Sequence, residues 1–122
     1  MTFPTIKFKA TNISPDAHLE DYTIDKFETL TKHLGYHEDS TCHVEFERLV
    51  AHKSGNVCRA EATLFAHGKT FRAESTEATF EQAIDTVRKA LDHELARAHK
   101  KHDTLIMRGR RKVKQWMLFG NK

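Results

Sequence analysis

Residues 79–102, TFEQAIDTVRKALDHELARAHKKH, decide the fold. Thr79 and Gln82 have the spacing of a capping box, in which two side chains satisfy free amides at the start of a helix. Apolar residues then recur at three- and four-residue intervals, which is the spacing of a single helical face. This face consists of Phe80, Ala83, Ile84, Val87, Leu91, Leu95 and Ala98. The stretch therefore predicts a long amphipathic helix whose apolar face packs on another element.

The predicted helix is longer than the strands that it has to cover. From residue 80 to residue 102 it would measure about 34 Å at ~1.5 Å per residue. A strand of five or six residues spans only about 17–20 Å. The last helical turns should therefore extend past the sheet, and they carry Arg97, Lys100 and Lys101.

Three stretches before this helix, residues 42–47, 58–64 and 71–75, alternate between apolar and polar residues, as strands with one buried face do. Their predicted core face consists of Val44, Phe46, Ala60, Ala62, Leu64, Phe71 and Ala73. The opposite face, continued by residues 3–10, consists of Lys7, Lys9, Glu45, Glu47, Arg59, Glu61, Arg72 and Glu74. Because Phe65 is the one aromatic residue on that face, we expect a solvated surface rather than a platform that stacks bases.

The N-terminal part adds one strand and one helix. Residues 3–10 alternate as a half-buried strand, and Ser14 followed by Pro15 predicts a helix that Ser14 caps and Gly35 ends. One face of this helix carries Leu19, Tyr22, Phe27, Leu30 and Leu34. The order β-α-β-β-β-α predicts a two-layer α+β domain over residues 1–102, with two helices on one face of a four-stranded sheet. Residues 103–122 should form a flexible basic tail with an apolar end.

The two cysteines, Cys42 and Cys58, are expected to stay reduced. If the strands around them pair as a hairpin, facing residues have numbers that sum to about 106, so Cys42 lies opposite Leu64 and Cys58 opposite Arg48. The sulfur atoms would then lie six positions apart, roughly 20 Å at ~3.3 Å per residue. A disulfide needs Cα atoms within about 7 Å.

The net charge of +3 hides an uneven distribution. Residues 1–85 hold 9 Lys and Arg against 14 Asp and Glu, whereas residues 86–122 hold 11 against 3. A basic third on a slightly acidic body indicates a polyanionic partner, most often nucleic acid. The sequence has no apolar run near the ~20 residues of a membrane span and no signal-peptide core, which favours a cytoplasmic protein.

Three stretches of the sequence resemble a known family. They are 13–17 (ISPDA), 25–30 (DKFETL) and 79–85 (TFEQAID), the last followed by Leu91, Leu95, Arg97, Lys100 and Lys101. Their order and spacing resemble the ribosome hibernation promoting factors, also called ribosome-associated inhibitor A or sigma-54 modulation proteins, in their short form. The likeness extends over about residues 3–102. The chain differs from the family where it has Glu81, Ala90 and His93 in place of the frequent Tyr, Lys and Arg.

This resemblance implies a translation inhibitor of stationary or stressed cells. It would bind the small ribosomal subunit between head and body and occupy the mRNA channel and the tRNA sites, with Lys and Arg contacting ribosomal RNA. The residues that we expect to bind RNA are Lys26, Arg88, Lys89, Arg97, Lys100, Lys101, Arg108, Arg110, Arg111, Lys112 and Lys114. Binding by these side chains would depend on shape and backbone charge and would weaken with salt.

Other functions remain open at the level of sequence. The basic surface also fits a general RNA- or DNA-binding module without a ribosomal role. The apolar end, Trp116 to Phe119, either folds back on the core or docks a partner or second protomer, which would make the chain an adaptor. The nine histidines and two cysteines lack the spacing of a zinc site, and no catalytic or phosphate-binding motif is present. We therefore expect no enzyme activity, metal, cofactor or small-molecule substrate.

Overall fold

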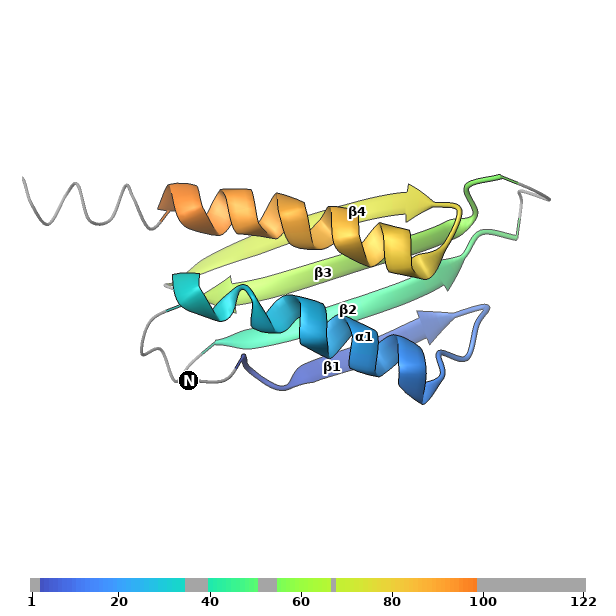
Figure 1. The fold of residues 1–122 in the computed structure, drawn as a ribbon, viewed down its shortest axis with the longest axis horizontal. Coiled ribbons are helices and arrows are strands. Elements are labelled where there is room, and N and C mark those ends of the chain that lie inside the picture. Colours follow the sequence, from blue (N-terminus) through green and yellow to red (C-terminus); the bar gives the residue numbers. More distant parts are fainter. Residues whose placement is uncertain (1–2, 35–39, 51–54, 67, 99–122) are drawn as a thin grey trace, which may run out of the picture.

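The computed structural model describes residues 3–34, 40–50, 55–66 and 68–98 (Figure 1). Its elements are β1 (Ile6–Thr11), α1 (Ala17–Glu28), the 3-10 turn η1 (Thr31–His33), β2 (Thr41–Arg48), β3 (Cys58–Ala66) and β4 (Lys69–Glu77). A second helix, here called the C-terminal helix, follows and is described over residues 80–98. The predicted order β-α-β-β-β-α is confirmed. No helix in these described ranges is both long and apolar enough to cross a membrane.

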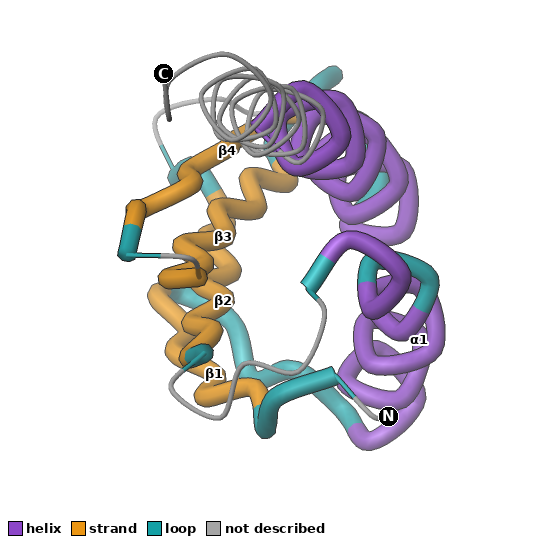
Figure 2. The backbone as a smooth tube through the Cα atoms, turned by 90° about the vertical axis from the view of Figure 1, so that its left-hand side faces the viewer, coloured by secondary structure: helices purple, strands orange, loops and turns teal. Residues whose placement is uncertain are grey.

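The four strands form one mixed sheet in the order β1-β2-β3-β4. β1 and β2 are parallel and are joined through α1, whereas β2, β3 and β4 form successive antiparallel hairpins. Both helices cover the same face of this sheet, as Figure 2 shows. The predicted two-layer α+β architecture is therefore confirmed.

The register of the β2–β3 hairpin is the one that the sequence predicts. Cys42 lies opposite Leu64 and Arg48 lies opposite Cys58. The two cysteines are therefore far apart along the ladder, and both are buried free thiols. Burial raises the pKa of the Cys42 thiol to about 12, so this side chain stays protonated at neutral pH.

The core lies between the sheet and the two helices. Strand residues at alternate positions are buried together with the predicted apolar face of the C-terminal helix, of which only Ala98 is partly exposed. Phe46 of β2 is fully buried, and its ring meets that of Phe80 edge to face at 5.6 Å between centroids. On the α1 side, Phe3 packs edge to face on Phe27 at 5.8 Å. Such aromatic pairs add about 0.5–1.5 kcal/mol beyond the burial of their area.

The first helix differs from the prediction at both ends. Asp16, not Ser14, is the N-cap, and its carboxylate accepts a hydrogen bond of 2.8 Å from the amide of Leu19. The helix ends at Glu28, and the chain tightens into η1 rather than continuing as an α-helix toward Gly35, which lies outside the described residues. Both corrections have a local cause, because Asp is as good a cap as Ser and the Thr29 hydroxyl bonds back to the Lys26 carbonyl at 2.7 Å.

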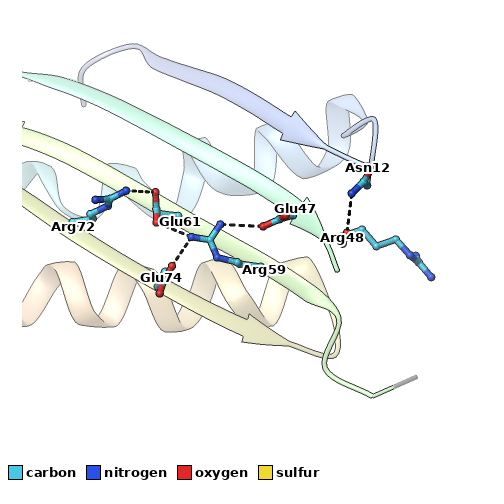
Figure 3. Close-up of polar contacts among 7 residues, drawn as sticks. All are labelled: Asn12, Glu47, Arg48, Arg59, Glu61, Arg72 and Glu74. Carbon is cyan, nitrogen blue, oxygen red and sulfur yellow. Dashed lines mark hydrogen bonds and ion pairs between the residues drawn. The ribbon is translucent and has the colours of Figure 1, made fainter. Parts of the chain in front are cut away.

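The uncovered face of the sheet carries a network of ion pairs centred on Arg59 (Figure 3). The Arg59 guanidinium contacts the carboxylates of Glu47 at 3.4 Å, Glu61 at 2.7 Å and Glu74. Arg72 contacts Glu61 at 2.9 Å. These bonds lower the pKa of Glu61, with the hydrogen bond from Arg72 as the largest cause. Together with Lys7, Lys9 and Glu45, the two arginines and three glutamates of this network give the face four positive and four negative side chains, so its charge is balanced.

Candidate RNA-binding surface

The two helices run side by side in the same direction and are joined by polar contacts. The Tyr22 hydroxyl donates to Asp85 at 2.9 Å, and further along His33 Nε2 lies 2.8 Å from Asp92. Between them, Arg88 reaches the Thr29 hydroxyl at 3.5 Å. The contacts advance together along the C-terminal helix and along α1, Thr29 and η1, so the two segments run in the same direction. We call this row of contacts the interhelical seam.

The acids of the seam also hold cations from α1 and η1. Lys26 Nζ lies 3.9 Å from Asp85, and Lys32 Nζ lies 4.0 Å from Asp92. The Lys26 ammonium also lies 5.3 Å from the centre of the Tyr22 ring. Each lysine keeps a large exposed fraction, 43% for the Lys26 side chain and 67% for that of Lys32. Both can therefore reach a polyanion that approaches the helix layer.

Two groups in the seam have shifted pKa values. The pKa of Asp92 is lowered, chiefly by its hydrogen bond with His33 and against an opposing effect of burial. The pKa of Tyr22 is raised, first by burial and then by its hydrogen bond to the Asp85 carboxylate, which would repel a phenolate. Both shifts favour the ionised carboxylate and the neutral phenol, so the seam is intact at neutral pH.

Four of the predicted RNA-binding residues lie in the described part of the chain. Lys26 and Arg88 belong to the seam, whereas Lys89 is exposed beside it on the C-terminal helix. Arg97 is 77% exposed near the end of the described helix and lies 3.9 Å from Glu94. The predicted tail over residues 103–122 lies outside the described residues, as do these predicted contacts: Lys100, Lys101, Arg108, Arg110, Arg111, Lys112 and Lys114.

Sequence reasoning left Lys32, Asp85 and Asp92 out of the site. Lys32 is more exposed than Lys26 and lies on the same helix layer. Asp85 and Asp92 are seven residues apart, two helical turns, so they share one side of the C-terminal helix next to its apolar face. This spacing, together with the polar positions on α1 that match it, is the sequence signal that could have identified the two acids as site residues.

The positive charge of the chain is concentrated after residue 98. Residues 1–98 hold 12 Lys and Arg against 16 Asp and Glu, whereas residues 99–122 hold 8 against 1. The described helix layer therefore supplies individual cations that are partly offset by neighbouring acids. Most of the net positive charge belongs to the segment that follows it. A polyanion that contacts both the helix layer and residues 99–122 would lie along the C-terminal helix toward its end.

Comparison with protein families identifies the class to which this chain belongs. The chain matches the family described as sigma 54 modulation protein / S30EA ribosomal protein over residues 6–103. This match covers most of the 122 residues, and the chain belongs to that family. The resemblance identified from the sequence is thereby confirmed. A comparison with curated proteins gave no match.

Solved structures share the fold. The N-terminal domain of Protein Y from Thermus thermophilus has a TM-score of 0.62 and 24% identity, covering 75% of this chain and 93% of that one. A ribosomal subunit interface protein from Coxiella burnetii has a TM-score of 0.61 and 16% identity, covering 76% of this chain and 94% of that one. At these identities the likeness concerns the arrangement of strands and helices.

Proposed function

We propose that the chain is a hibernation factor that binds the small ribosomal subunit and blocks translation by occupying the mRNA channel and the tRNA sites. The observation that carries the proposal is family membership over residues 6–103, which include every described strand and helix. The Coxiella burnetii protein with the same fold, a ribosomal subunit interface protein, points to the same kind of partner. No chemical step is required, because a folded domain in the channel is sufficient to exclude mRNA and tRNA.

The charge distribution supports ribosomal RNA as the surface that is contacted. Ribosomal RNA presents closely spaced phosphates, and each Lys or Arg that neutralises one releases a condensed counterion. The proposed contacts are the four described cations Lys26, Arg88, Lys89 and Arg97, with Lys100 and Lys101 and the basic residues 108–114. The balanced charge of the uncovered sheet face makes that face a poor competitor for RNA.

The proposal is tested by cosedimentation with purified small subunits at low and high salt. We expect the chain to travel with the subunit at low salt and to dissociate as salt rises, because counterion release drives binding. It should also inhibit translation of a reporter mRNA in a cell-free system. A chain that stays at the top of the gradient at low salt would contradict the proposal.

A general nucleic-acid-binding module is the second candidate, favoured by the concentration of positive charge in residues 99–122. Bulk duplex RNA added to the same gradients separates the two functions. A ribosome-specific factor remains on the subunit in the presence of a mass excess of duplex. A general binder is displaced in proportion to the competing phosphate.

A further inference from the structure

β4 is a long strand at the edge of the sheet. Within the described sheet it pairs with β3 alone, and its nine residues, KTFRAESTE, run from Lys69 to Glu77 in unbroken register. It contains no Pro or Gly. Edge strands of this length offer a row of backbone amides and carbonyls that can pair with another strand, and proteins commonly shorten, bend or interrupt them. The described backbone of β4 is neither short nor interrupted, so its protection against pairing with other strands consists of its charged side chains.

The sequence of β4 is complementary to itself when it is read in the opposite direction. In an antiparallel pair of two β4 strands centred on Ala73, Lys69 faces Glu77 and Arg72 faces Glu74. Thr70 faces Thr76, and Ala73 faces its own copy. Opposite charges directly across an antiparallel pair are stabilising, as like charges are destabilising. Every charged side chain of the strand therefore meets its opposite in this one register.

The neighbouring registers are unfavourable. Among registers that keep both helix layers on the same face of the joined sheet, the nearest alternatives are centred one residue to either side of Ala73. A centre at residue 72 places Arg72 against Arg72, and a centre at residue 74 places Glu74 against Glu74. Like charges directly opposite each other destabilise a pair. The charges of β4 therefore favour a second copy of β4 as the partner strand, and they favour a single register for the pair.

The helix layer leaves the rim of β4 accessible. Ala60 and Ala62 of β3 are fully buried under the C-terminal helix, whereas Ala73 and Ser75 on the same face of β4 are only partly buried. The C-terminal helix therefore covers β3 more completely than the outer strand. On the other face, the side chains of Arg72 and Glu74 are 67% and 60% exposed.

We propose that β4 is a docking edge for a second copy of this chain, with the two strands antiparallel about Ala73. The two sheets then become one continuous sheet with both helix layers on the same side. The ion-pair network of Figure 3 continues across the junction, because Arg72 already binds Glu61 at 2.9 Å and has further guanidinium donors for Glu74 of the other copy. This self-association is independent of the proposed ribosomal function.

The dimer formed in this way is weak and depends on concentration. A single pair of strands buries less than the ~1,200 Å² at which stable interfaces begin. Sedimentation velocity of the full chain over a range of concentrations at low salt should therefore show a mass that rises toward twice that of the chain. The association should weaken at high salt, because the cross-strand charges are exposed.

Charge reversal provides the decisive test. Arg72→Glu places a carboxylate against Glu74 of the other copy, and Glu74→Arg places a guanidinium against Arg72, so each variant alone should remain monomeric. An equimolar mixture of the two variants should dimerise again, because each copy then meets opposite charges. Lys9→Glu on β1, the other edge, is the matched control and should dimerise like the unaltered chain. Circular dichroism verifies that the variants are folded.

A cross-link at the centre of the pair is the second measurement. Facing Cα atoms in an antiparallel pair lie about 4.5–5.5 Å apart, which is within disulfide range. Ala73→Cys should therefore form a covalent dimer on mild oxidation, whereas Lys9→Cys should not. A chain that is monomeric at all concentrations, a mixture that fails to dimerise, or an Ala73→Cys variant that does not cross-link would each overturn the proposal.

Discussion

Asp92 connects the C-terminal helix to η1 through a single carboxylate, which is bonded to His33 and flanked by Lys32. Its side chain is about one-third exposed, so solvent screens part of the interaction. The lowered pKa means that the folded state favours the ionised carboxylate more than the unfolded chain does. The stabilisation is therefore present above the ordinary pKa of 3.8 and is lost as the pH falls through the lower, folded value.

Replacing this carboxylate should have an effect that depends on pH. We expect Asp92→Asn to lower the free energy of unfolding by about 1 kcal/mol or less at pH 7. The difference from the unaltered chain should begin to shrink below about pH 3.8 and disappear as the pH falls through the lower, folded pKa, where the Asp92 carboxyl takes up a proton and loses its charge as well. Urea denaturation at several pH values measures both. A difference that does not change with pH would show that the charge of Asp92 is not the cause.

At the scale of the element, substitutions at the start of α1 can distinguish its two candidate caps, Ser14 and Asp16. Asp16→Ala should lower the free energy of unfolding by about 1 kcal/mol, because the Leu19 amide loses its acceptor. Ser14→Ala is the matched control and should have little effect. Thermal or urea denaturation of the two variants compares them directly. A larger loss of stability in Ser14→Ala than in Asp16→Ala would mean that Ser14 is the cap.

The C-terminal helix offers a similar comparison between its buried and exposed sides. Leu91 is fully buried and the neighbouring Lys89 is exposed. Leu91→Ala should cost about 2–5 kcal/mol, since it removes buried methyl groups and leaves a cavity. Lys89→Ala should change stability by no more than about 0.5 kcal/mol while it weakens binding to RNA. Equal losses of stability in the two variants would contradict the assigned helix face.

These elements also show what the sequence could and could not predict. The β2–β3 register followed from alternation on both sides of one loop, because a shift by one residue would expose the whole core face. The cap of α1 could not be decided, since Ser14 and Asp16 are both good caps. Asp85 and Asp92 were missed as site residues because their role depends on the position of α1, and the periodicity of one helix does not specify the packing of two.

At the scale of the whole molecule, removing cations from the end of the C-terminal helix should weaken binding to small subunits more than removing cations from the uncovered sheet face. Replacing Arg97, Lys100 and Lys101 by Ala should weaken binding to small subunits and reduce the slope of log affinity against log salt by about 2–3, since each phosphate contact contributes roughly 0.7–0.9. Lys7 and Lys9 on the uncovered sheet face are the matched control, and their replacement by Ala should leave the slope unchanged. Filter binding over a salt series measures both variants. An equal effect of the two sets would mean that the cations act only through net charge.

The parallel pairing of β1 with β2 has a consequence for how the chain folds and opens. Ile6 lies opposite Cys42, 36 positions later, whereas β2, β3 and β4 pair with strands that are neighbours in sequence. Closing the longer loop costs more entropy, and β1 is held at one edge only. During synthesis, β1 is made before its partner strand, so we expect it to join the sheet late. Its amides should accordingly exchange with deuterium sooner than those of β3, which has a neighbour on each side.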